Sequence, residues 1–156
     1  TPAEDRYVMA VLATAECPYF SVSRIEIDRA GRSFTIDTLH ELRGMSEYCD
    51  SEFYFITGLD AVMDIMTWKD PQAIVKMCKF VAVSRYGFTH KRLEELPPDL
   101  RGAIIPLEIP LLAISSTQLR DRVSRNSSIR FLVPPAVESY IKKKSLYKSI
   151  NGRESL

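Results

Sequence analysis

The chain has 156 residues, of which 46% are hydrophobic and 26% are charged. This composition is typical of one globular domain and excludes a chain that stays disordered. Its 21 basic residues nearly cancel its 20 acidic ones, so we expect no overall field that draws the protein onto nucleic acid or an anionic membrane.

The apolar runs and the cysteines exclude two further classes. Residues 104–114 are mostly apolar, but Pro106, Glu108 and Pro110 interrupt a stretch that is about half a membrane span. The three cysteines lack the spacing of a zinc site or a redox pair. We therefore expect no membrane span, no metal site built from protein ligands, and a reducing, cytoplasmic location.

Apolar spacing and cap residues predict helices that alternate with strands. In chain order we expect a helix over 2–15 capped by Thr1, a strand over 20–27, a turn at Ala30 and Gly31, and a helix from Ser33 or Thr35 to Gly44. There follow a strand over 53–56 that ends at Gly58, short helices over 59–66 and 71–77, and a strand over 79–84. The remaining elements are a helical turn in 89–96, a strand over 103–109, and helices over 116–123 and 135–144.

This alternation predicts an α/β fold with a parallel sheet and helices on both faces, the doubly wound class. We expect the strands over 53–56 and 79–84 to be buried on both faces. Residues 1–147 are expected to form a single domain and 148–156 a flexible tail. In such sheets ligands bind at the carboxyl ends of the strands, which directs attention to the residues that follow each strand.

The segment 114–120 carries the clearest local pattern. Ser115 and Gln118 match a capping box that opens a helix just after an apolar run. Free N–H groups at a helix start bind anions, and Ser116 with Arg120 would add a hydroxyl and a guanidinium for a polyphosphate. The structural alternative is a plain cap with a solvated arginine.

Three other positions allow both a binding and a structural interpretation. Gly58 and Asp60 follow a strand, where a nucleotide could approach the backbone and a carboxylate could accept from its hydroxyls, or where a simple strand-to-helix turn could lie. Trp68 could stack on a heteroaromatic ring or pack in the core. Thr35 lies where N–H groups at a helix start could bind a carboxylate or simply begin the helix.

Taken in order, these segments resemble the bacterial nicotinate-nucleotide adenylyltransferases along nearly the whole chain. The segments that carry the resemblance are EDR (4–6), IEI (25–27), GRSFTIDTL (31–39), FITGLD (55–60), Trp68, FVAVSR (80–85), ISSTQLR (114–120) and VPPAVESYI (133–141). Phe34 differs, since an aromatic residue with a polar edge is common there in the family.

The resemblance implies a Rossmann-like nucleotidyltransferase that moves the adenylyl group of Mg-ATP to nicotinate mononucleotide, in the synthesis of NAD. Its ATP-binding residues would be Gly58, Asp60, Arg85, Ser115, Ser116 and Arg120, with Ser115 and Arg120 also acting in catalysis. Its acceptor-binding residues would be Thr35, Trp68 and Lys69, with backbone at Thr35 and Lys69 receiving the pyridine carboxylate. The cofactor implied is Mg²⁺, bound with ATP.

The same family begins with a strand, a Gly-rich turn and a His-x-Gly-His-type motif that this sequence does not contain. We therefore expect a segment to precede Thr1 in the native protein, and little or no turnover from this chain alone. Two alternatives stay open at this stage. One is a related adenylyltransferase that accepts nicotinamide mononucleotide or phosphopantetheine, and the other is a nucleotide-binding module without catalysis. The sequence also leaves open a homo-oligomer.

Overall fold

The structure is a computed structural model that describes residues 1–85, 93–110 and 112–148. The predicted helical turn in 89–96 therefore lies partly outside the described residues, and the predicted tail over 148–156 lies almost wholly outside them. The chain divides into two compact units, which are described separately. Unit 1 joins Thr1–Asp28 to Ala113–Leu156, and unit 2 is Arg29–Leu112. The single domain over 1–147 stays a prediction.

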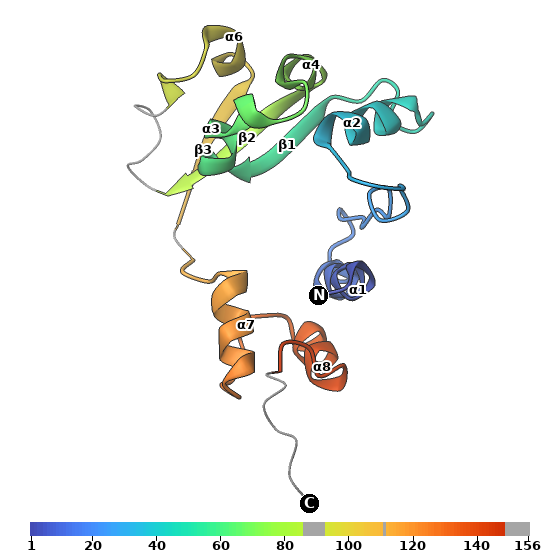
Figure 1. Ribbon diagram of the computed structural model, residues 1–156, viewed down its shortest axis with the longest axis vertical. Coiled ribbons are helices and arrows are strands. Elements are labelled where there is room, and N and C mark those ends of the chain that lie inside the picture. The colour runs from blue at the N-terminus through green and yellow to red at the C-terminus, as the bar shows by residue number, and fades with distance from the viewer. Residues whose placement is uncertain (86–92, 111, 149–156) are drawn as a thin grey trace, which may run out of the picture. The chain divides into compact units, whose positions relative to one another are not determined.

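Unit 2 is built on a parallel sheet. Its three strands, β1 (Phe53–Gly58), β2 (Cys78–Arg85) and β3 (Ile104–Ile109), lie side by side in that order (Figure 1). The register places Phe55 opposite Phe80, and Phe80 opposite Ile104. Parallel strands joined through helices define the α/β class, so the predicted fold class is confirmed.

Short helices precede and connect these strands, and local chemistry fixes where they begin. They are α2 (Thr35–Gly44), α3 (Leu59–Met63), the 3₁₀ turn η1 (Ile65–Thr67), α4 (Pro71–Met77) and α6 (Pro98–Arg101). Asp70 caps α4, because its side chain accepts a hydrogen bond of 3.1 Å from the Ala73 N–H while Pro71 takes the first helical position. The predicted order of helices and strands is confirmed from α2 to β2 and again at β3, whereas α6 was not predicted.

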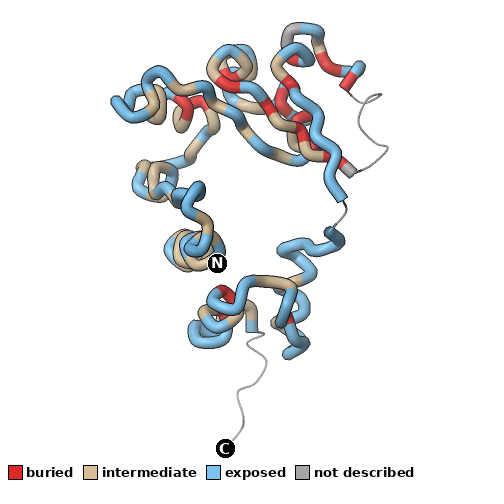
Figure 2. Tube along the Cα trace, turned by 180° about the vertical axis from the view of Figure 1, so that it is seen from behind, coloured by how far each residue is buried: buried red, intermediate tan, exposed pale blue. Residues whose placement is uncertain are grey.

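The core of unit 2 lies on one face of the sheet, where α3 and α4 pack against it. Figure 2 shows most of the buried residues along these strands and helices. The largest side chains that are fully buried are Phe80, Ile65, Ile74, Leu100 and Val62. Burying side chains of this size contributes roughly 1.5–3 kcal/mol each, so this layer is what stabilises the unit.

The other face of the sheet is more open than its sequence predicts. Tyr54 is 48% exposed and Ile56 is 71% exposed, while Phe55 between them packs on the core. The prediction that residues 53–56 are buried on both faces is therefore wrong. A continuous apolar run gives no information on what covers the second face, whereas the observed alternation follows the two-residue repeat of a strand.

The described part of unit 1 contains the helices α1 (Ala3–Thr14), α7 (Ser116–Ser124) and α8 (Pro135–Lys143). A small cluster of Ile129, Val137 and Ile141 forms its buried centre. The Tyr140 hydroxyl of α8 donates a 2.7 Å hydrogen bond to the Asp5 carboxylate of α1, which also raises the pKa of that tyrosine. The cap of α1 differs from prediction, since Pro2 stands at the N-cap and no side chain caps the helix.

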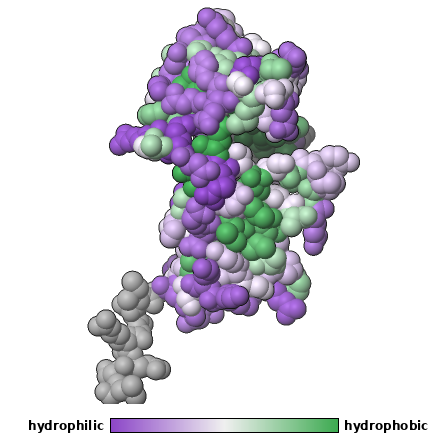
Figure 3. Space-filling view, turned by 90° about the vertical axis from the view of Figure 1, so that its right-hand side faces the viewer, coloured by the Kyte–Doolittle hydropathy of each residue, from purple (hydrophilic) through white to green (hydrophobic). Residues whose placement is uncertain are grey.

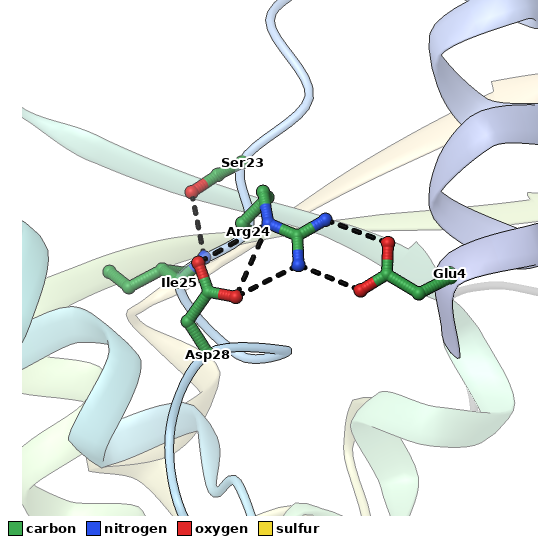
Figure 4. Close-up of polar contacts among 5 residues, drawn as sticks. All are labelled: Glu4, Ser23, Arg24, Ile25 and Asp28. Carbon is green, nitrogen blue, oxygen red and sulfur yellow. Dashed lines mark hydrogen bonds and ion pairs between the residues drawn. The ribbon is translucent and has the colours of Figure 1, made fainter. Parts of the chain in front are cut away.

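The segment between α1 and unit 2 is the main error in the predicted elements. Residues 20–27 form no strand, because the chain turns at 25–27, where the Ile27 and Asp28 N–H groups donate to the Arg24 carbonyl. The Arg24 guanidinium lies between Glu4 and Asp28, at 2.7 Å and 3.0 Å (Figure 4). A strand needs a neighbour for its backbone groups, and here the hydrogen bonds are local instead.

Large apolar side chains also reach the surface, as the green areas among hydrophilic residues in Figure 3 show. They include Ile105, Leu107 and Ile109 of β3, each more than two-fifths exposed.

In the part of the chain that the structure describes, no helix is long and apolar enough to cross a membrane.

Candidate functional site

Two predicted residues lie at the carboxyl edge of the sheet. β1 ends at Gly58, which pairs with Val83, and β2 runs on to Arg85, which pairs with Ile109. The side chain of Arg85 lies outside the described part of the structure. Both positions are where an open parallel sheet binds ligands, as the sequence predicts.

Gly58 has an ordinary extended backbone, with φ −68° and ψ 149°. A Cβ atom built on this glycine would meet nothing within 4 Å. Neither backbone conformation nor protein packing therefore requires glycine here. Asp60 follows in the first turn of α3, with an exposed side chain, while Leu59 between them is buried and holds the turn in place.

The structure brings together the start of α2 and the segment after η1. Phe34 is the N-cap of α2, and its side chain accepts no hydrogen bond. The side chain of the N-cap residue therefore gives no acceptor to the first N–H groups of the helix, which begin at Thr35. The Lys69 ammonium lies 2.9 Å and 3.1 Å from the two carboxylate oxygens of Asp37, in the same first turn. It also lies 4.8 Å from the centre of the Phe34 ring.

Sequence reasoning missed Asp37. Its only signal is an acid in the first turn of a predicted helix, a common arrangement that favours the helix dipole. Its contact with Lys69 spans 32 residues, and so it depends on the fold rather than on a local pattern.

Trp68 shows features of both interpretations. Its ring packs edge-on against Phe55 and Phe80, with centroids 5.7 Å and 6.0 Å apart, as a core residue would. The residue is nevertheless only half-buried, and its neighbour Lys69 is exposed. Core packing holds one side of the indole and leaves part of the side chain accessible.

In unit 1 the capping box is confirmed in full. The Ser115 hydroxyl accepts from the Gln118 N–H, and the Gln118 side chain accepts from the Ser115 N–H, both at 3.2 Å. Arg120 lies on the same end of α7 and donates to the Thr117 hydroxyl at 3.1 Å. Exposed hydroxyls, a helix start and a guanidinium are thus held together within two turns.

None of the groups with a shifted pKa in the described residues is one of these positions. Hydrogen bonds from Arg24 lower the pKa of Glu4, and those from Tyr54 lower that of Glu52, with Lys79 adding to the effect. Burial raises the pKa of the Cys78 thiol to about 11, so it is not an activated nucleophile. No group of three or more metal-ligating side chains occurs among the described residues.

The parallel sheet with ligand positions at its carboxyl edge, together with a capped helix start rich in hydroxyls, is typical of nucleotide-binding α/β proteins. The cytidylyltransferase-like family model matches residues 1–122 of this chain. This match covers more than half of the chain, so the chain is a cytidylyltransferase-like protein.

Curated relatives narrow the assignment. A probable nicotinate-nucleotide adenylyltransferase of Moorella thermoacetica is 50% identical over 153 residues, which cover 95% of this chain and 70% of that protein. Those of Acidothermus cellulolyticus and Frankia alni are 46% and 48% identical, covering 97% and 94% of this chain and 73% and 74% of theirs. The chain belongs to the nicotinate-nucleotide adenylyltransferases, a family of enzymes, as its sequence motifs predict.

A solved structure supports the fold. The nicotinic acid mononucleotide adenylyltransferase of Plasmodium falciparum, in complexes with APC and with NaAD, matches with a TM-score of 0.68 over 94% of this chain. The match covers 76% and 75% of those chains at 20% identity. At this identity the likeness confirms the Rossmann-like arrangement and no individual residue.

Proposed function

We propose that the protein transfers the adenylyl group of ATP to nicotinate mononucleotide, forming nicotinate adenine dinucleotide and releasing pyrophosphate. Beyond family membership, the observation that carries the proposal is the start of α7. There Ser115 is fixed by a reciprocal capping box and Arg120 is tied to the same turn. These groups suit a triphosphate, since a helix start offers N–H donors and the arginine guanidinium is positively charged at every physiological pH.

In this proposal Ser115, Ser116 and Arg120 bind the triphosphate of ATP. Ser115 keeps its hydroxyl proton available, because the capping box uses the oxygen only as an acceptor. Ser116 occupies the first helical position, and both serines are exposed. The guanidinium of Arg120 would stabilise negative charge that develops on the leaving pyrophosphate, and that role makes it the main catalytic residue.

The adenosine is assigned to Gly58 and Asp60, with Arg85 lining the same region. The open space around Gly58 supports this assignment, since a side chain there would enter the volume that a nucleotide needs. Asp60 offers an exposed carboxylate to accept from ribose hydroxyls or from an amino group.

Nicotinate mononucleotide is assigned to Thr35, Trp68 and Lys69. The exposed part of Trp68 would stack on the pyridine ring, and backbone N–H groups of Thr35 and Lys69 would bind its carboxylate. An amide in place of the carboxylate would turn an NH₂ group toward these donors and leave them unpaired, which favours the acid over nicotinamide mononucleotide.

The reaction needs no covalent enzyme intermediate. An oxygen of the acceptor's phosphate attacks the α-phosphorus of ATP, and a new P–O bond forms. The bond from the α-phosphorus to the oxygen bridging the β-phosphate breaks, and pyrophosphate leaves with that electron pair. The protein's contribution is positioning and charge stabilisation, as in other phosphoryl transfers.

Nucleotidyltransferases of this kind work with a divalent metal ion, and we assign Mg²⁺ to that role. The described residues offer no group of three metal-ligating side chains. That donor set fits an ion that is held mainly by phosphates and water, so Mg²⁺ would arrive bound to ATP and offset part of its charge.

The test is an assay of pyrophosphate release by the full-length native protein with ATP and Mg²⁺, run with each of three acceptors: nicotinate mononucleotide, nicotinamide mononucleotide and phosphopantetheine. Arg120→Met should lower kcat about 10²- to 10³-fold while changing the free energy of unfolding by less than about 0.5 kcal/mol. Arg125→Met is the matched control, because Arg125 lies beyond the end of the same helix in an exposed ion pair with Asp121. Transfer to another acceptor in preference, or full activity of Arg120→Met, would contradict the proposal.

A further inference from the structure

The two segments assigned to the pyridine carboxylate are distant in sequence but connected in the structure. Thr35 begins α2, and Lys69 follows Trp68 at the end of η1. The side chains of Asp37 and Lys69 join them through hydrogen bonds of 2.9 Å and 3.1 Å to both oxygens of one carboxylate. A single ion pair thus connects the start of α2 to the backbone beside Trp68.

We infer that Asp37 is a positioning residue that sets the acceptor specificity of this enzyme by fixing Lys69 against the start of α2. The inference rests on the proposed function, because it concerns the two backbone donors assigned there to nicotinate. Asp37 itself does not touch the substrate. Its carboxylate holds Lys69, and Lys69 carries one of the two N–H groups that must converge on one anion.

The geometry favours this role over a purely electrostatic one. Asp37 engages the ammonium with both oxygens, and the Phe34 ring lies 4.8 Å from the same nitrogen. The ammonium is therefore held between a carboxylate and an aromatic face, both belonging to the start of α2. A lysine whose function is to attract the substrate's charge would be better left without a neutralising carboxylate.

These two roles predict opposite results for one substitution. If Asp37 positions the donors, Asp37→Asn weakens binding of nicotinate mononucleotide, because Lys69 and its N–H lose their anchor. If Lys69 acts as a free positive charge, the same change strengthens binding of the acid, since a competing negative charge is removed. Both partners are half-exposed, at 51% for Lys69 and 34% for Asp37, so either effect is modest.

The test is a titration of tryptophan fluorescence with nicotinate mononucleotide and with nicotinamide mononucleotide, since Trp68 is the only tryptophan and adjoins Lys69. In Asp37→Asn we expect the Kd for the acid to rise about twofold to fivefold, with a smaller change for the amide. Asp37→Glu should restore part of the acid preference. The acid-to-amide ratio is a readout that a role in folding alone would not move.

Glu41→Gln is the matched control, because Glu41 is also a carboxylate of α2 and pairs at 2.5 Å with Arg29, outside the acceptor positions. Unchanged or tighter binding of the acid by Asp37→Asn, while the wild type binds it, would overturn this inference and leave the proposed function standing. A wild type that transfers adenylyl to the amide and binds no acid would overturn both.

Discussion

Gly58→Ala separates binding from folding more cleanly than any other substitution in the candidate site. The backbone of Gly58 already has φ −68° and ψ 149°, which alanine adopts without strain, and an added Cβ meets nothing within 4 Å. Because alanine leaves the unfolded chain fewer conformations than glycine does, the substitution should raise the free energy of unfolding by about 0.4–1 kcal/mol. Alanine is a poorer N-cap than glycine and offsets part of this gain.

The net change in the free energy of unfolding should therefore stay within about 1 kcal/mol, a Tm shift of at most about 2–4 °C for a chain of this size. ATP binding should respond differently. If adenosine approaches the Gly58 backbone, the new methyl group overpacks the complex at a cost of about 1–3 kcal/mol. This corresponds to a rise of roughly fivefold to 150-fold in the Kd for ATP.

The assay is a thermal unfolding curve and a calorimetric titration with Mg-ATP for each variant. Gly44→Ala is the control, because Gly44 ends α2 and its added Cβ also meets nothing. It should keep wild-type affinity for ATP and gain up to about 1 kcal/mol of stability. Wild-type affinity in Gly58→Ala would refute the close approach of a nucleotide, and a Tm loss beyond about 5 °C would refute the structural reasoning at this glycine.

Two further predictions concern unit 1. Ser115→Ala removes the hydroxyl that accepts from the Gln118 N–H, whereas the backbone N–H of residue 115 can still donate to the Gln118 side chain. We expect a loss of about 0.5–1 kcal/mol by chemical denaturation. Ser116→Ala should cost less because its hydroxyl makes no cap, and equal losses would contradict the cap assignment. Glu4 has a pKa lowered by its hydrogen bonds from Arg24, so its stabilising contribution is complete above the ordinary carboxyl pKa and disappears as the pH falls through the lowered one. As the pH is lowered from 7 to 2, the urea midpoint should therefore decrease less in Glu4→Gln than in the wild type. Parallel curves of midpoint against pH would show that the Glu4–Arg24 pair does not influence stability.

Local patterns predicted well the features that local chemistry decides. The capping box at Ser115 and Gln118 was predictable because both partners lie within one helical turn. β1 and β2 were predictable because aromatic and β-branched residues cluster between clear turn signals. The positions of Gly58 and Arg85 at strand ends followed directly from these strands.

Features that depend on distant partners were not predictable from the same patterns. Residues 20–27 alternate like a strand, yet Arg24 hydrogen-bonds within the segment and pairs with Glu4 on α1, 20 residues earlier. The Asp37–Lys69 pair is likewise visible only once α2 and η1 are placed in space. The exposure of Ile56 belongs to the same class, since an apolar residue does not reveal whether anything packs over it.

The discontinuity of unit 1 has a consequence for the order in which the chain acquires structure. Unit 2 is continuous over Arg29–Leu112, and its strands and helices can pair as soon as they leave the ribosome. Asp5 must instead wait for Tyr140, 135 residues later, before α1 and α8 can join. Such a long loop slows closure and leaves the apolar side of α1 without its partner during most of synthesis. We therefore expect α1 to be the element that most needs chaperone protection at birth, and the Asp5–Tyr140 contact to be among the last that the folding protein completes.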